Sequence, residues 1–78
     1  ALRAGGTAST VLNAANEEAV SAFLDRRLGF TRIADVISAS LDAIASTAAR
    51  TLDDVLEADA RARSVSRSLI SRWMEEVV

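Results

Sequence analysis

The feature that most constrains this chain is the placement of its helix breakers. There is no proline, and the three glycines are Gly5, Gly6 and Gly29. Proline costs about 3 kcal/mol and glycine about 1 kcal/mol in a helix interior, so long stretches without either favour continuous helices. Gly29 also suits the left-handed position that ends many helices. The sequence therefore predicts an all-α fold with a break near residue 29.

Apolar residues repeat at spacings of three and four in three segments of the chain, as on one face of a helix. We predict helices over about residues 8–27, 32–45 and 52–77. The loop before the last helix is expected around residues 46–50. A chain of 78 residues has room for one small core. We therefore expect a single domain, residues 1–78, built as a small bundle of three main helices, with room for a fourth short one.

Side chains that can cap a helix precede each segment. Thr7 or Ser9 can accept a hydrogen bond from a free backbone N–H at the start of the first helix, and Thr31 can do so for the second. Thr51 is followed three residues later by Asp54, which is a variant of the capping box. These residues predict where the three helices begin.

The residue types that the chain lacks narrow its chemistry. It contains no His, Cys, Lys or Tyr, and therefore lacks most of the usual general bases, covalent nucleophiles and zinc ligands. We expect no catalytic, cofactor-binding or metal-binding residues. No segment approaches the roughly 18 to 20 apolar residues that cross a bilayer, so no membrane partner is expected. The absence of Cys, and with it of disulfides, makes a cytoplasmic domain the expectation. Because the chain opens on Ala1 and not on Met, we expect a piece of a larger protein.

An arginine-rich stretch in the third segment raises the alternative of a DNA-binding module. Its members are Arg61, Arg63, Arg67 and Arg72. Carboxylates stand four residues from three of them, in the pairs Glu57–Arg61, Asp59–Arg63 and Arg72–Glu76. The formal net charge of −2 also disfavours binding to phosphates. We expect a solvated, salt-bridged helix face and no nucleic-acid partner. An independent helical interaction or DNA-binding module remains the alternative.

Three polar residues lie on or beside the apolar faces and are the candidate structural residues. Asn13 and Asn16 border the apolar face of the first helix, and we expect Asn16 to be partly buried. Asp59 falls within the apolar stripe of the third helix, where an unpaired charge is costly. Its donors are expected from Asn13, Asn16, the first backbone N–H groups of the first helix, or Arg63. The adjacent carboxylates Glu17 and Glu18 are expected on the surface.

The length of the third helix is itself a constraint. At 1.5 Å per residue, residues 52–77 would form a helix of roughly 39 Å, which is longer than the ~30 Å diameter of a globule of this size. We expect a bend or an overhang beyond Ser64, because several serines weaken the helix there. Trp73 is expected to dock on the bundle or on a neighbouring domain.

Several motifs of this sequence resemble one known family. They are Gly5-Gly6-Thr7, Leu12-Asn13-Ala14-Ala15-Asn16-Glu17, Ala19-Val20, Phe23-Leu24, Phe30-Thr31, Ile33, Val55-Leu56-Glu57-Ala58-Asp59-Ala60 and Ala62-Arg63. Together they resemble the C-terminal part of the 1-deoxy-D-xylulose 5-phosphate reductoisomerase family. Ser9 and Glu18 depart from the residues that the family often carries, proline and an aliphatic residue respectively.

The resemblance implies a larger, multidomain α/β enzyme of the non-mevalonate pathway of isoprenoid biosynthesis. Its NADPH-binding domain and a central domain with Mg²⁺ or Mn²⁺ would precede this bundle. That enzyme isomerises and reduces its sugar phosphate to 2-C-methyl-D-erythritol 4-phosphate, and it is usually a homodimer. The resemblance assigns the present chain a supporting role, inactive alone, with the upstream domains as its partners. On this view Asn13, Asn16 and Asp59 are architectural.

Overall fold

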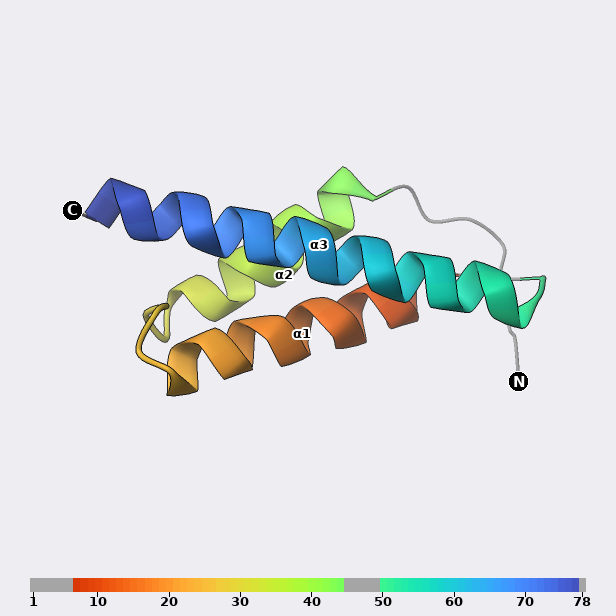
Figure 1. The fold of residues 1–78 in the computed structure, drawn as a ribbon, viewed down its shortest axis with the longest axis horizontal. Helices are drawn as coiled ribbons and strands as arrows, with labels where there is room; N and C mark the ends of the chain where they lie inside the picture. The colour runs from red at the N-terminus through yellow and green to blue at the C-terminus, as the bar shows by residue number, and fades with distance from the viewer. Residues whose placement is uncertain (1–6, 45–49, 78) are drawn as a thin grey trace.

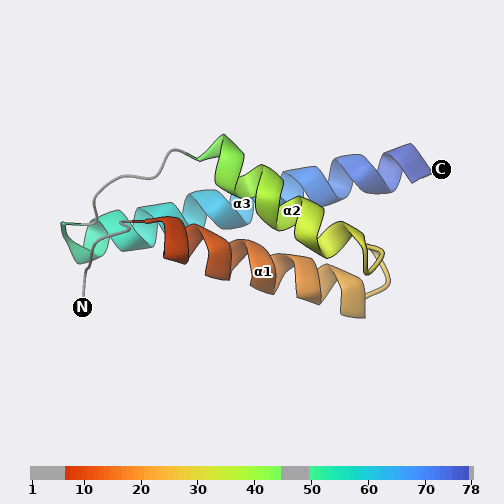
Figure 2. The ribbon, with the colours of Figure 1, turned by 180° about the vertical axis from the view of Figure 1, so that it is seen from behind.

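The chain folds into three α-helices and is all-α, as predicted. The computed structural model describes residues 7–44 and 50–77, with side chains up to Trp73. The helices are α1 (Ala8–Leu24), α2 (Arg32–Ala43) and α3 (Leu52–Val77). Within these ranges there is no strand and no fourth helix. In Figures 1 and 2, α1 and α3 run in the same direction and α2 runs against both.

Helix α1 ends three residues earlier than predicted, and the left-handed residue is Arg26 and not Gly29. Arg26 has φ 61°, and its N–H donates to the carbonyl of Phe23 at 3.0 Å. The N–H of Arg27 donates to the carbonyl of Ala22 at 2.8 Å. These two bonds form a Schellman motif, which satisfies the last carbonyls of the helix. The motif ends α1 before the glycine is reached, and Leu28 is then buried under the turn.

The starts of the helices follow the capping residues, although the caps differ in kind. Thr51 Oγ1 accepts the Asp54 N–H at 3.2 Å, and the Asp54 carboxylate accepts the Thr51 N–H at 3.2 Å, which confirms the capping box of α3. Thr31 precedes α2 but makes no side-chain capping bond. Thr31 itself has helical dihedral angles, and the N–H groups of Arg32 and Ile33, which a cap would satisfy, already donate to carbonyls of the preceding turn. Helix α2 ends at Ala43, and the loop expected at residues 46–50 falls mostly outside the described residues.

The core consists of two apolar clusters along the bundle. One contains Val11, Ala14, Ile44, Ala58 and Ala62, and the other contains Ala19, Ala22, Leu28, Val36 and Ile70. Ser40 of α2 and Ser66 of α3 are fully buried, and their hydroxyls lie 3.0 Å apart. Small side chains on all three helices allow the backbones to approach closely. The core is therefore narrow and rich in alanine.

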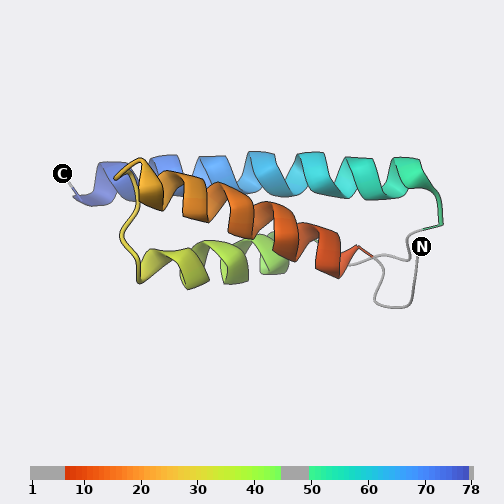
Figure 3. The same cartoon turned by 90° about the horizontal axis from the view of Figure 1, so that it is seen from below.

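Helix α3 is continuous from Leu52 to Val77 and is much longer than its two partners. Figure 3 shows that its first turns run beyond the start of α1, so an overhang lies at this end as well as past Ser64, where we expected it. The serine-rich part is held in the bundle, because Ser66 is buried against Ser40. Trp73 packs against the second apolar cluster, as predicted, and the Arg32 guanidinium lies 4.9 Å from its ring centroid.

None of the three described helices combines the length and apolar composition that crossing a bilayer requires.

Candidate functional site: an ionic cluster between α1 and α3

Five charged side chains link α1 to α3, and Arg63 is at their centre. We call Glu17, Glu18, Asp59, Arg63 and Arg67 the ionic cluster. The Arg63 guanidinium donates to both Asp59 carboxylate oxygens, at 2.9 and 3.2 Å, within its own helix. Its two terminal nitrogens also reach Glu18 at 3.2 Å and Glu17 at 3.0 Å on α1. A single side chain therefore binds three carboxylates on two helices.

Arg67 adds a second bridge one helical turn further along α3. Its Nε and Nη2 atoms donate to the two Glu18 carboxylate oxygens at 3.0 and 3.1 Å. The Glu18 side chain retains only 15% of its exposure. The hydrogen bond from Arg67, aided by Arg63, lowers the pKa of Glu18 despite this burial. In return, the hydrogen bonds from the carboxylates raise the pKa of Arg63 and of Arg67 above the ordinary range.

The structure separates the three residues that the sequence placed together. Asp59 is half-buried and accepts its hydrogen bonds from Arg63, one of its expected donors. Asn13 is exposed and donates to Glu17 at 3.2 Å, one turn along the same helix. Asn16 is exposed, so the expectation of partial burial was wrong. The two asparagines face away from the core because Val11, Ala14, Ala15 and Ala19 occupy the buried side of α1.

The sequence analysis missed the carboxylates that join the two helices. Glu17 and Glu18 were both expected on the surface, but Glu18 is largely buried beneath two arginines. The available signal was the pair Arg63 and Arg67, four residues apart and therefore on one face of α3. Of the ion pairs expected within α3, Asp59–Arg63 forms. Among the described side chains Glu57 and Arg61 form none, and the side chain of Glu76 lies outside them.

The ionic cluster forms contacts that hold α1 against α3. Three carboxylates face two guanidinium groups, and each carboxylate accepts at least one charge-assisted hydrogen bond. Among the described residues no group of three acidic side chains is arranged to hold a metal ion. No described buried side-chain nitrogen or oxygen lacks a hydrogen-bond partner. The charged groups of the cluster are thus engaged with one another.

Comparison with known proteins shows which protein family this chain is similar to. The family model described as DXP reductoisomerase C-terminal domain matches residues 1–65. The chain is 59% identical over 70 residues to the 1-deoxy-D-xylulose 5-phosphate reductoisomerase of Aromatoleum aromaticum, covering 90% of this chain and 17% of that protein. It is 52% identical over 73 residues to the enzyme of the same name from Nitrosococcus oceani, covering 94% of this chain and 19% of the relative.

The match to a third relative has the same proportions. The reductoisomerase of Cellvibrio japonicus is 52% identical over 73 residues, covering 94% of this chain and 18% of that protein. The chain thus spans less than a fifth of the length of these relatives. The chain belongs to the DXP reductoisomerase C-terminal domain family.

Proposed function

We propose that residues 1–78 form one C-terminal structural domain of a 1-deoxy-D-xylulose 5-phosphate reductoisomerase and carry none of its catalytic residues. The observation that supports this most directly is the 59% identity over 90% of the chain to a named reductoisomerase of which it spans only 17%. The ionic cluster gives the domain a defined geometry, because it fixes the rotation of α1 against α3. In this role the domain braces the upstream catalytic part of the same polypeptide.

The activity of the parent enzyme follows from the family. It isomerises its sugar phosphate and reduces it with NADPH to 2-C-methyl-D-erythritol 4-phosphate, in isoprenoid biosynthesis by the non-mevalonate pathway. NADPH and Mg²⁺ or Mn²⁺ bind to the upstream domains, and the enzyme acts as a cytoplasmic homodimer. Asn13, Asn16 and Asp59 have architectural roles in this proposal, with Asp59 acting through Arg63.

Among the side chains that the structure describes, none are grouped in a way that fits a divalent cation. Glu17, Glu18 and Asp59 come closest to forming a cluster of carboxylates, but their oxygens already accept hydrogen bonds from two guanidinium groups. Mg²⁺ prefers carboxylates that are free to complete an octahedron of oxygen ligands. The metal chemistry of the parent enzyme is therefore assigned to residues outside this chain.

The alternative of a DNA-binding module is less well supported by the same contacts. Arg63 and Arg67 are two of the four arginines that suggested it, and both are bound to carboxylates of α1. An arginine held in this way must break charge-assisted hydrogen bonds before it can contact a phosphate. We therefore expect no salt-dependent retention of the domain on heparin or duplex DNA.

The experiment compares three proteins: the full-length enzyme, a truncated enzyme lacking residues 1–78, and the 78-residue chain. NADPH oxidation is followed with deoxyxylulose phosphate and Mg²⁺. We expect activity from the full-length enzyme, loss of activity from the truncated one, and no activity from the chain alone. Mixing the two parts should restore activity. Substrate-dependent NADPH oxidation by the pure 78-residue chain would contradict the proposal, as would full activity of the truncated enzyme.

A further inference from the structure

Helix α1 carries apolar residues outside its buried side as well as on it. The buried side is formed by valine and alanine, including Val11, Ala15 and Ala22. Beside it, four residues follow one another at intervals of four, and we call them the α1 outer face: Leu12, Asn16, Val20 and Leu24. Leu24 is 74% exposed and Leu12 is 47% exposed. Large aliphatic side chains therefore point away from the domain's own core.

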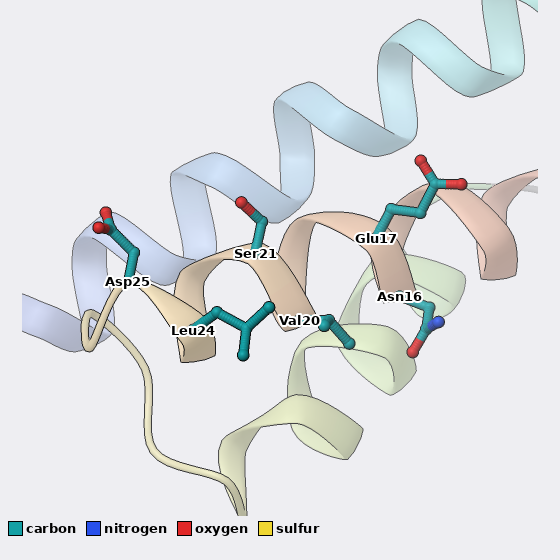
Figure 4. A pocket seen from close by; sticks show the side chains of 6 residues that line it. All are labelled: Asn16, Glu17, Val20, Ser21, Leu24 and Asp25. Carbon is teal, nitrogen blue, oxygen red and sulfur yellow. The ribbon is translucent and has the colours of Figure 1, made fainter.

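A shallow, open hollow lies on this side of α1. Its lining residues are shown in Figure 4, where Asn16, Val20 and Leu24 are directed to one side of α1, and Glu17, Ser21 and Asp25 to the other. One wall is thus uncharged and largely aliphatic, whereas the other is polar. Val20 sits in the hollow and is half-buried.

Helix α2 presents a different outer surface. Its exposed residues include Arg32, Asp35 and Asp42, whereas α3 exposes Leu52 and Leu56 near its start, next to charged residues. A surface helix ordinarily pairs one apolar stripe with a charged face, whereas a helix that is apolar on all sides is buried. The α1 outer face contains no charged residue over about three helical turns. It therefore has the composition of a covered surface.

We infer that, in the full-length enzyme, the α1 outer face is covered by an aliphatic segment of the same polypeptide that lies outside residues 1–78. This inference rests on the proposed function, because it requires a longer parent chain. More than four-fifths of the length of the relatives lies outside the region matched by this chain. A stable dimer buries about 800 Å² on each partner, which a single row of three aliphatic side chains does not supply. A covalently connected segment needs less area, because its effective concentration is high.

The test uses Leu24→Cys in the full-length enzyme, with Ser68→Cys as the matched control. Both positions are exposed in the domain, so neither substitution removes a core contact, and residues 1–78 contain no other cysteine. The rate of maleimide labelling at each position is divided by the rate in urea-unfolded protein, and labelled peptides are assigned by mass spectrometry. We expect Cys at position 24 to label at least tenfold more slowly than Cys at position 68 on this scale. Equal normalised rates would overturn the inference.

A second measurement identifies what covers the face. A maleimide–benzophenone reagent attached at position 24 is photoactivated, and the products are separated by mass. We expect a cross-link within one chain, to a peptide from outside residues 1–78. A product of twice the mass would point to a second copy and overturn the inference, as would a cross-link to residues 1–78 or none.

NADPH oxidation is assayed on the same proteins, so that the two proposals fail separately. An active enzyme with an unprotected position 24 would overturn only the inference that the α1 outer face is covered. An inactive wild-type enzyme with a protected position 24 would overturn only the proposed function.

Discussion

At the scale of single residues, Arg63 determines how the two long helices meet. A guanidinium group is planar and carries five N–H donors in a fixed fork, so it can bind several carboxylates in defined directions. Arg63 uses this fork to bind Asp59 on its own helix and Glu17 and Glu18 on α1. A lysine would offer one compact charge and could not reproduce these contacts. The cluster therefore specifies the geometry of the α1–α3 contact as well as stabilising it.

This arrangement is tested by comparing the loss of stability that three substitutions cause. Asp59→Ala removes an i,i+4 pair at a half-buried site and should cost about 0.3–0.5 kcal/mol. This is less than the roughly 1–3 kcal/mol expected for a buried group that loses its only partner. Arg63→Ala should lower the midpoint of urea unfolding further, because three carboxylates lose a donor. Arg61→Ala, on the exposed side of α3, is the control and should leave the midpoint unchanged. A larger loss from Asp59→Ala than from Arg63→Ala would contradict the assignment.

The lowered pKa of Glu18 predicts how stability depends on pH. The ordinary value is 4.5, and the bonds from Arg67 and Arg63 place the folded-state pKa below it. Glu18 therefore contributes stability that is fully present above pH 4.5 and is lost as the pH falls through the folded-state value. We expect the urea midpoint to fall between pH 7 and pH 3, and Glu18→Gln to reduce that fall. Glu57→Gln on the exposed side of α3 is the control. An identical pH profile in the wild type and Glu18→Gln would exclude this contribution.

At the scale of elements, the sequence predicts where helices start better than where they end. The start of α3 depends on Thr51 and Asp54, whose local hydrogen bonds follow from their spacing alone. The end of α1 depends on Arg26, a residue type with no preference for positive φ. Burial of Leu28 in the core stabilises this turn, and a single sequence does not specify such a tertiary contact. Gly29 was therefore the wrong marker for the end of the helix.

The cap of α3 is tested by comparing two threonines. Thr51→Ala removes the side-chain acceptor of the Asp54 N–H and should cost about 1 kcal/mol, which is typical of an N-cap. Thr31→Ala is the matched control, because Thr31 precedes a helix but makes no side-chain capping bond. It should cost less than about 0.5 kcal/mol. Urea unfolding of the two variants gives both values. Equal costs would show that the capping box does not stabilise α3.

At the scale of the whole molecule, the helix faces could be predicted only in part, and the contacts between helices could not be predicted. Periodicity identifies Ala62 and Ile70 of α3 as inward-facing, and both are buried, but Leu52 and Leu56 of the same apolar pattern are exposed. The rotation of α1 against this stripe depends on how side chains on both helices interlock. For that reason Glu18, and not Asn16, meets α3. The sequence analysis therefore missed residues that contact another helix, whereas it predicted the three helices themselves.

The contact between α2 and α3 depends on a buried pair of hydroxyls, and this gives the last prediction. Ser40 and Ser66 have no solvent exposure and are hydrogen-bonded at 3.0 Å, between partners 26 residues apart. Either Ser→Ala change leaves the other hydroxyl buried without this bond, so each should cost about 1–3 kcal/mol. The double variant no longer has an orphaned hydroxyl at either position and should cost less than the sum, with a coupling of at least about 0.5 kcal/mol.

The control for this cycle is Ser68→Ala, an exposed serine on α3, which should cost less than about 0.5 kcal/mol. All four variants are compared by urea unfolding at the same pH. The comparison separates the hydrogen bond from the small size of serine, because alanine also permits the close approach of α2 and α3. Strict additivity of the Ser40→Ala and Ser66→Ala costs would mean that small size alone sets the distance between the helices. A positive coupling would mean that the hydrogen bond between the two hydroxyls itself stabilises the contact between α2 and α3.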